Sequence, residues 1–326
     1  MVSERSIPLE ARSEWERALE AVPHMFGHTW GSAHAHSLTT GYRSFLYEAR
    51  EDGARAVCPL VERPADGRRD VATPYGFSGL AGTGPWPSPG NLLTGLARRR
   101  RYVCGYITVN PLFGDESHAA PNELSFVNHT YTLDLTQDRE TLYHNLSKNR
   151  KRQLRAWRPG LHESHREPLT AFFLHEYPRF MEGKNAAAYY RFSGETLAAI
   201  CGLPNVFLLG ARAAGRLEAV SVFGYTRHAG DFLFNASLPG GKRHSASLLW
   251  SAVQRLIELS VPVLNLGGGL SPGDSLAGFK QRFGARSRPM YVVKKIYDPV
   301  AFEALCRRAG RDPEVLDGFF PPYRDR

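Results

Sequence analysis

Apolar and polar positions alternate along this chain in two periods, one typical of strands and one typical of helices. In the first part, short apolar runs at 42–49 and 54–62 flank a polar turn with glycine, and a further run at 102–109 ends before a proline. Each of the three is predicted to be a strand. The spacing predicts helices over 13–21, with Ser13 as cap, over 31–37 and over 92–101.

The later part of the chain reads as a second set of elements. From Val206, glycine turns separate three strand-length runs, which predicts an antiparallel meander. The pattern before and after the meander predicts a strand at 130–135, an irregular loop at 113–126, helices at 140–157, 169–183, 194–201, 244–259 and 299–308, strands at 262–266 and 286–296, and a C-terminal tail.

Residues 265–284 combine the features that most suggest chemistry. A short apolar strand ends at three glycines, 271–275 offer residues that start a helix, and apolar positions three or four apart follow. Lys280 lies in this helix beside Phe279. A strand, a glycine loop and a helix with one cation can hold an acyl group and stabilise negative charge. Lys280 is therefore predicted to be catalytic, with a surface or structural cation as the alternative.

Length and composition allow two domains in an ordinary globular protein. The chain has 326 residues, of which 42% are hydrophobic and 22% charged. No apolar run approaches the roughly 20 residues that span a bilayer, so we expect a cytoplasmic protein without a membrane anchor. Four scattered cysteines lack metal-binding or disulfide spacing, and we expect each to be a buried apolar residue: Cys58, Cys104, Cys201 and Cys306.

Charge favours anionic partners such as RNA, nucleotides or phosphorylated substrates, although a biased composition would give the same total. Lys and Arg number 41 against 32 Asp and Glu, a formal charge of +9. Lys148, Arg152 and Arg155 share one face of the helix predicted at 140–157, and Arg150 and Lys151 widen the basic patch. Five cations in eight residues without an acid are typical of phosphate binding. Packing on an acidic face of the same protein is the alternative.

Two aromatic segments are further candidates for substrate contact. Residues 73–80 contain Tyr75 and Phe77 between prolines and glycines, so the segment is predicted to line a cleft or to plug the core. Tyr190 and Arg191 belong to an aromatic and basic cluster that either contacts substrate or staples two helices.

Five strings, in this order along about two thirds of the chain, resemble the FemXAB-like acyltransferases. They are TPYGFSG at 73–79, HNLSKNRKRQLRAW at 144–157, AAYYRFS at 187–193, FLFNAS at 232–237 and NLGGGLSPGDSLAGFKQRFG at 265–284. This family is related to the peptidyltransferases that transfer an amino acid from aminoacyl-tRNA to an amine of a peptidoglycan precursor. The resemblance implies an α+β fold of two tandem N-acetyltransferase-like (GNAT-like) domains, with mixed, mostly antiparallel sheets flanked by helices and a substrate cleft between them. We expect domains at 1–150 and 151–326, with the boundary between about 136 and 170.

The resemblance also implies roles for single residues. Phe279 and Lys280 match a Phe-Lys pair at the acceptor end of the tRNA, so Lys280 would stabilise the oxyanion or the terminal adenosine, and Phe279 would stack on or shape that pocket. Two positions depart from the family pattern. Phe234 lies close to a tyrosine position, and Asn110 replaces an aspartate before proline; a neutral amide cannot act as a base.

The leading hypothesis is an aminoacyl-tRNA-dependent N-acyltransferase that forms an amide, without metal or bound cofactor. Its acceptor would be a peptidoglycan precursor or, as the two departures favour, a small-molecule amine. The alternatives are an acyl-CoA-dependent N-acyltransferase and a non-catalytic RNA- or envelope-binding protein. Substrate contacts are predicted for Thr73, Tyr75, Phe77, Asn110, Tyr190, Arg191, Phe234, Asn235, Ser237, Asp274, Ser275 and Phe279, and tRNA or phosphate contacts for Lys148, Arg150, Lys151, Arg152, Arg155, Lys242, Arg243 and Arg282.

Overall fold

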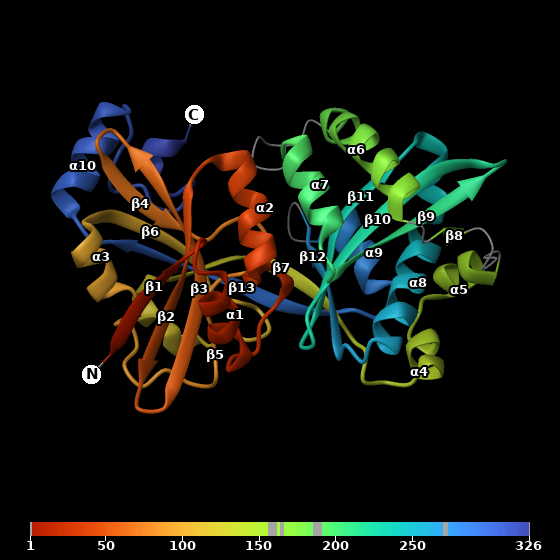
Figure 1. Cartoon of the computed structure of the whole chain (residues 1–326), viewed down its shortest axis with the longest axis horizontal. Coiled ribbons are helices and arrows are strands. Elements are labelled where there is room, and N and C mark those ends of the chain that lie inside the picture. The colour runs from red at the N-terminus through yellow and green to blue at the C-terminus, as the bar shows by residue number, and fades with distance from the viewer. Residues whose placement is uncertain (1, 156–161, 164–165, 185–190, 270–272, 326) are drawn as a thin grey trace. The chain divides into compact units, whose positions relative to one another are not determined.

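The chain forms two compact units in the computed structural model, which describes all residues except 1, 156–161, 164–165, 185–190, 270–272 and 326 (Figure 1). The first unit contains Met1–Val127 and Pro289–Arg326, and the second contains Asn128–Arg288. The chain passes between them within two strands, β7 (Leu124–Asp134) and β13 (Arg286–Ile296). The boundary expected between 136 and 170 falls inside the second unit, and the C-terminal residues return to the first.

The first unit is a mixed sheet with helices on its faces. Its strand order is β1-β2-β3-β4-β6-β13, and β4 and β6 run parallel. Its strands besides β13 are β1 (Ser3–Pro8), β2 (Arg43–Glu51), β3 (Ala54–Ala65), β4 (Arg68–Ala72), β5 (Ala81–Gly82), which pairs with β3, and β6 (Tyr102–Thr108). Its α-helices are α1 (Arg12–Glu20), α2 (Trp30–Thr40), α3 (Thr94–Arg100) and α10 (Pro299–Arg308), and its 3-10 helices are η1 (Phe26–His28), η2 (Glu116–His118), η3 (Pro121–Glu123) and η7 (Pro322–Arg324).

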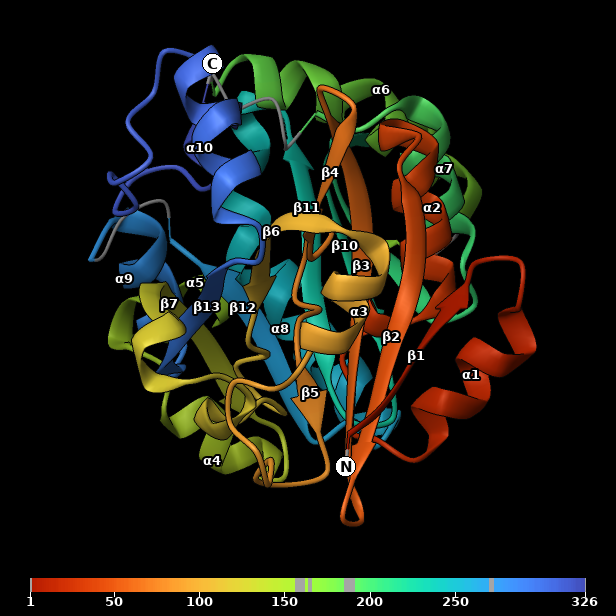
Figure 2. The same ribbon diagram turned by 90° about the vertical axis from the view of Figure 1, so that its left-hand side faces the viewer.

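Helices bury both faces of this sheet (Figure 2). Phe45 and Tyr47 of β2 pack in a cluster with Leu96 of α3, whereas Leu46 lies in a cluster with Trp15 of α1. A strand covered on both sides reads as a continuous apolar run rather than an alternating one. The predicted helix 13–21 is confirmed as α1, but Ser13 is not its cap, because the N-cap position is Ala11 and no side chain caps this end.

The C-terminal residues pack against the first unit, so the prediction of a tail is wrong. Phe320 is buried and stacks on Phe302 of α10. Asp70 of β4 is fully buried, and its two carboxylate oxygens accept hydrogen bonds from Arg63 and Arg324, each at 2.6 Å. A buried carboxylate must be paired, and this requirement fixes the last residues of the chain.

The second unit has the strand order β7-β12-β11-β10-β9-β8. The meander of β9 (Val206–Ala213), β10 (Arg216–Tyr225) and β11 (Gly230–Ser237) is confirmed. The strand predicted at 262–266 is confirmed as β12 (Val263–Gly268), which pairs parallel to β11. The remaining elements are β8 (His162–Glu163), α4 (Arg139–His144), α5 (Lys148–Arg155), α6 (Arg166–Glu182), α7 (Gly194–Gly202), the 3-10 helix η6 (Pro239–His244), α8 (Ser245–Glu258) and α9 (Ser275–Gln281).

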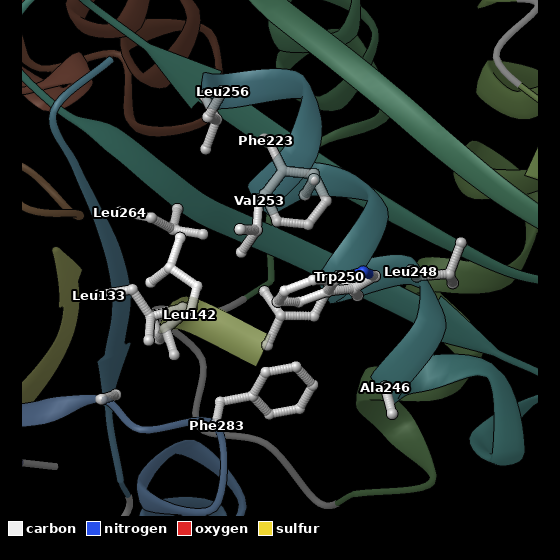
Figure 3. Packing of buried hydrophobic residues seen from close by; sticks show 14 of the residues in the cluster. Leu133, Leu142, Phe223, Ala246, Leu248, Trp250, Val253, Leu256, Leu264 and Phe283 are labelled. Atoms are coloured by element: carbon white, nitrogen blue, oxygen red, sulfur yellow. The ribbon is translucent and has the colours of Figure 1, made fainter. Parts of the chain in front are cut away.

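Helices also cover both faces of the second sheet. Trp250 of α8, Leu142 of α4 and Phe283 pack in one cluster with Phe223 of β10 (Figure 3). On the opposite face α6 lies so close to β9 that a Cβ at Gly210 would meet the side chain of Leu169. The predicted α+β fold with mixed, mostly antiparallel sheets and flanking helices is confirmed. Within the described ranges, no helix combines the length and the apolar character needed to cross a bilayer.

Two irregularities in this sheet shape the candidate site. β11 and β12 pair only at Gly230 with Leu264 and at Asp231 with Asn265. Further along, the pairing of β10 with β11 shifts at Val222 and Phe223, so that β11 contains an extra residue, Leu233. Such a bulge turns the next side chain to the other face. Phe232 stacks on Phe223 in the α8 cluster, whereas Phe234 packs on α6.

The prediction of a single helix at 140–157 is wrong, because the structure has two separate helices there, α4 and α5. Between them, the backbone N–H of Ser147 donates to the carbonyl of Arg282, just after α9, at 2.9 Å. Gly284 lies so close to Asn145 that a Cβ would contact its backbone and side chain. The break in the basic segment therefore joins α5 to the end of the helix that carries Lys280.

Candidate functional site

The site is built around the buried ammonium of Lys280. Helix α9 is capped by Asp274, whose carboxylate accepts a hydrogen bond from the backbone N–H of Ala277 at 2.8 Å. One and a half turns later, Lys280 Nζ donates to the carbonyl oxygens of Gly267 and Gly268, at 2.8 and 2.5 Å. Its side chain is only 8% exposed. Helix capping thus fixes α9 so that one cation meets the end of β12.

Burial weakens the hold of Lys280 on its proton. Desolvation lowers its pKa from 10.5 to about 8, against the opposing effect of the Asp274 carboxylate. An ammonium has three N–H donors, and two of them bind the glycine carbonyls. The third has no hydrogen-bond acceptor in the described part of the chain, and the ammonium lies 5.8 Å from the ring centroid of Tyr131. Lys280 therefore offers one donor in a desolvated setting, where electrostatic interactions are strong.

The glycine run binds a cation with its carbonyl groups rather than an anion with its amides. Gly267 adopts a left-handed conformation at φ +74, which favours glycine. Besides the two carbonyls on Lys280, the carbonyl of Gly269 accepts a hydrogen bond from Asn128 Nδ2 at 2.9 Å. Stabilisation of negative charge at this place consequently depends on the lysine and not on the loop.

Arg150 connects the basic helix to α9. Its guanidinium carbon lies 4.1 Å from the ring centroid of Phe279 and 5.5 Å from that of Phe283. The side chain is buried, and Nη1 donates to Gln153 at 2.6 Å. Burial, and to a lesser extent Arg282, lower its pKa. Arg150 thus packs against Phe279, the neighbour of Lys280 in the sequence. Because Arg150 is buried, the α5 cations that remain candidates for phosphate contact are the other four.

Four exposed cations lie on α5 or just after α9: Lys148, Arg152 and Arg155 on α5, and Arg282 after α9. Of these, Arg152 donates to Asn149 at 2.9 Å. The half-buried Lys151 donates to the carbonyl of His144, also at 2.9 Å. The predicted basic face is therefore present, and the junction of α5 with α9 adds Arg282 to it.

The excess positive charge of the chain lies entirely in the second unit. Residues 128–288 contain 21 Lys and Arg against 12 Asp and Glu, a formal charge of +9, whereas the first unit has 20 of each. A composition bias would charge both units alike. The concentration in the unit that contains α5 and Lys280 is typical of a surface that binds a polyanion.

A buried polar network supports the site and was not predicted from the sequence. Asn265 is fully buried on β12; its Oδ1 accepts hydrogen bonds from Thr130 Oγ1 at 2.6 Å and from the N–H of Gly267 at 3.1 Å. Its Nδ2 donates to the buried carboxylate of Asp231 at 3.0 Å. The sequence signal was a polar residue within each of two apolar strands; Asn265 opens the string 265–284, but the sequence assigned no role to Asn265 or Asp231.

The predicted substrate residues of β11 contact α6 and β10 rather than Lys280. The bulge directs Phe234 into a cluster with Phe173, Tyr177 and Phe192, with ring centroids 5.8, 5.3 and 5.7 Å away. Phe234 is buried there. Asn235 and Ser237 are half-buried, and Asn235 accepts a hydrogen bond from Ser221 at 2.9 Å.

The remaining predicted substrate residues of the second unit come from other segments. Ser275 and Arg191 are exposed, and Tyr190 lies outside the described residues.

The predicted residues of the first unit serve a loop of that unit. Asn110 is buried, and its Nδ2 donates to the carbonyls of Phe77 and Ser78 at 3.2 and 2.9 Å. Its Oδ1 accepts from the N–H groups of Leu112 and Phe113, both at 3.0 Å. An aspartate could not donate these bonds, which explains an amide before Pro111. Thr73 accepts a hydrogen bond from Thr108, and Tyr75 and Phe77 are half-buried.

Comparison with known proteins identifies the fold. No protein-family model and no curated protein matches the sequence. Among solved structures, the chain is similar to FemX, with a TM-score of 0.67 and 11% identity over 93% of this chain and 99% of FemX. It is also similar to the C-terminal domain named for a lysylphosphatidylglycerol synthetase of Agrobacterium fabrum, with a TM-score of 0.52 and 14% identity over 87% of this chain and 92% of that domain. L-PGS from Bacillus licheniformis has a TM-score of 0.50 and 14% identity over 92% and 97%. The FemXAB-like fold expected from the sequence is confirmed.

All four cysteines are buried and free, as predicted. Burial raises the pKa of Cys201 to about 12, so this thiol stays protonated at neutral pH. Among the described residues, no group of three His, Cys, Asp or Glu side chains is placed to hold a metal ion.

Proposed function

We propose that this chain is an N-acyltransferase that transfers an aminoacyl group from tRNA to an amine and so forms an amide bond. The acceptor amine attacks the ester carbonyl, and a C–N bond forms. The tetrahedral oxyanion then expels the ribose oxygen of the tRNA, which takes up a proton as the amine loses one. An ester is already activated, so the enzyme has to orient the amine and stabilise the oxyanion.

The observation that carries this proposal is how the Lys280 ammonium is held by the carbonyls of Gly267 and Gly268. Two carbonyls hold its ammonium in place, and one N–H remains for an oxygen that gains negative charge. A donor fixed in advance in a desolvated site stabilises a transition state without reorganising. The pairing of Phe279 and Lys280 on α9 is also the one that the family resemblance assigns to the acceptor end of tRNA.

A polyanionic donor is supported by the surroundings of Lys280. The exposed cations of α5 and Arg282 lie near the end of α9, where Ser147 donates to the carbonyl of Arg282, in the unit that has a formal charge of +9. Arg150 packs between this basic face and Phe279. Cations that displace counterions from phosphates add affinity that does not depend on base sequence.

The loop between β11 and α8 argues against acyl-CoA as donor. A pyrophosphate there would need free backbone N–H groups at the start of a helix. In η6 these groups form 3-10 turns, since Gly241 donates to Leu238 and Ser245 donates to Lys242. Gly241 lies directly on the backbone of Glu218, and the Glu218 carboxylate pairs with Arg243 at 3.0 Å. A carboxylate occupies the surroundings that a phosphate would require, and Arg243 is already paired.

The test measures transfer of a radiolabelled amino acid from charged tRNA to a panel of amines. The panel contains a peptidoglycan precursor and small-molecule amines, because both acceptors agree with the sequence. We expect amide product with charged tRNA and none with acyl-CoA. A preparation that binds acyl-CoA and uses it, but ignores charged tRNA, would reverse this choice of donor. A preparation that binds tRNA and transfers nothing would favour a non-catalytic RNA-binding protein.

A charge-matched pair of variants tests the polyanion. Replacing Lys148, Arg152 and Arg155 with Gln should weaken tRNA binding roughly 10-fold or more and reduce the salt dependence of log Kd by about three charges. Replacing three exposed arginines of the first unit, Arg17, Arg43 and Arg98, changes net charge equally and should leave Kd nearly unchanged. Equal losses in both would mean that only net charge matters, not the α5 face.

A further inference from the structure

We infer that Asn265 is a positioning residue for the two carbonyls that bind Lys280, those of Gly267 and Gly268. These two carbonyls are called the seat of Lys280. The inference rests on the proposed role of Lys280 in acyl transfer. Asn265 lies two residues before Gly267, is fully buried, and its side chain makes hydrogen bonds to three groups. None of these groups is solvent, so the amide has one orientation.

The argument begins with the pairing of β12 and β7. The ladder runs regularly to Asn265 opposite Thr132 and resumes only at Gly268 opposite Thr130. In the gap the N–H of Gly267 donates to Asn265 Oδ1 at 3.1 Å and not to a strand. This bond stabilises the left-handed turn of Gly267. With this turn formed, the carbonyls of Gly267 and Gly268 point to Lys280.

Asp231 sets which way the amide of Asn265 points. A carboxylate only accepts hydrogen bonds, and the N–H of Gly267 only donates. Nδ2 must therefore face Asp231, and Oδ1 must face Gly267. The two residues are also opposite each other in the parallel pair of β11 and β12, at the point beyond which these strands no longer pair. The chain of contacts thus leads from Asp231 through Asn265 and Gly267 to the ammonium.

A general structural role for Asn265 makes a different prediction from a positioning role. If the amide only stabilises the sheet, its loss weakens the whole unit and affects Lys280 no more than another buried hydrogen bond does. Thr226 provides the comparison: it is buried in the turn between β10 and β11, and its Oγ1 accepts from the N–H groups of His228 and Ala229 at 3.1 and 3.2 Å. Both residues bind backbone amides within this unit, but only Asn265 contacts the seat.

The first experiment follows Lys280 directly, without any substrate. Intact protein is treated briefly with acetic anhydride at pH 8, and the acetylation of Lys280 relative to exposed Lys184 is measured by mass spectrometry. Asn265→Leu should raise this ratio roughly tenfold, because local opening governs access to a buried group. Thr226→Val should leave it unchanged. Where Asn265→Leu does not fold, Asn265→Ser removes the same acceptor with a smaller side chain.

The second experiment uses the transfer reaction. Asn265→Leu should lower kcat about 100-fold with KM within a factor of about three, the effect of a misplaced catalytic group. Asp231→Asn retains an oxygen that accepts from Asn265 and should restore most of kcat relative to Asp231→Leu. Unchanged acetylation of Lys280 in folded Asn265 variants, or equal exposure in Thr226→Val, would overturn the inference. Absence of transfer by the unaltered protein would instead refute the proposed function and leave the acetylation result intact.

Discussion

Replacement of Lys280 by Met should reduce catalysis and affect stability in a pH-dependent way. The side chain keeps its length and loses its charge. Loss of one preorganised oxyanion donor typically lowers kcat by about 10²–10³, and we expect that loss here. Lys184→Met, a change at an exposed lysine of the same unit, is the matched control for charge.

The stability effect follows from the pKa of Lys280, which burial lowers from 10.5 to about 8. A tenfold change in protonation corresponds to about 1.4 kcal/mol, so keeping the buried amine charged costs about 3 kcal/mol at pH 7. The unfolded chain holds this proton up to about pH 10.5 and the folded chain only to about pH 8. Between these values the unfolded state binds more protons, so Lys280 makes the wild-type protein more stable as pH rises.

The Met variant lacks this titration. At pH 7.5 the relief of the charge offsets the loss of two hydrogen bonds to glycine carbonyls, so its free energy of unfolding should lie within about 2 kcal/mol of wild type. By pH 10.5 the free energy of unfolding of the Met variant, relative to that of wild type, should be lower by about a further 3 kcal/mol. Urea unfolding of both proteins at several pH values measures the difference, in which other titrating groups cancel. A difference that does not change with pH, or a kcat loss no larger than the fraction unfolded, would refute this account of Lys280.

Three further substitutions test the surrounding structure. Asn110→Asp replaces two donated hydrogen bonds by a buried charge and should lower the free energy of unfolding by about 3 kcal/mol, measured in urea at neutral pH. Arg150→Met should cost about 1–2 kcal/mol through the lost contact with Phe279, while Arg152→Met, an exposed neighbour on α5, should stay within about 0.5 kcal/mol; similar values for both would contradict the packing described for Arg150. Arg324→Met removes one partner of the buried Asp70 carboxylate and should cost about 2 kcal/mol or more, seen as a lower Tm, whereas a mobile C-terminus would show no change.

The sequence alone predicted most elements of the second unit. The meander, the parallel strand after it and the helix with Lys280 follow from local periodicity and glycine turns, and the structure confirms them. Apolar alternation is a local property, so it can be read without tertiary contacts. β13 and α10 were predicted with the bounds that the structure has.

Long-range contacts decided the rest. The return of the C-terminus to the first unit depends on partners for Asp70, which lies about 250 residues away along the chain. At the break between α4 and α5, Ser147 donates a hydrogen bond to Arg282, and Gly284 lies against Asn145. Neither partner leaves a local mark in the sequence, because each is defined only once the chain has folded.

The same division holds at the candidate site. Residue type and family resemblance pointed to Phe279, Lys280 and a basic helix, since cations and aromatics are visible as letters. Only the tertiary structure shows that the glycine run supplies carbonyls to Lys280, that Arg150 is buried against Phe279, and that Asn265 holds Gly267 in place. The environment of an ionisable group, and hence its pKa, arises from burial and contacts that no stretch of sequence contains by itself.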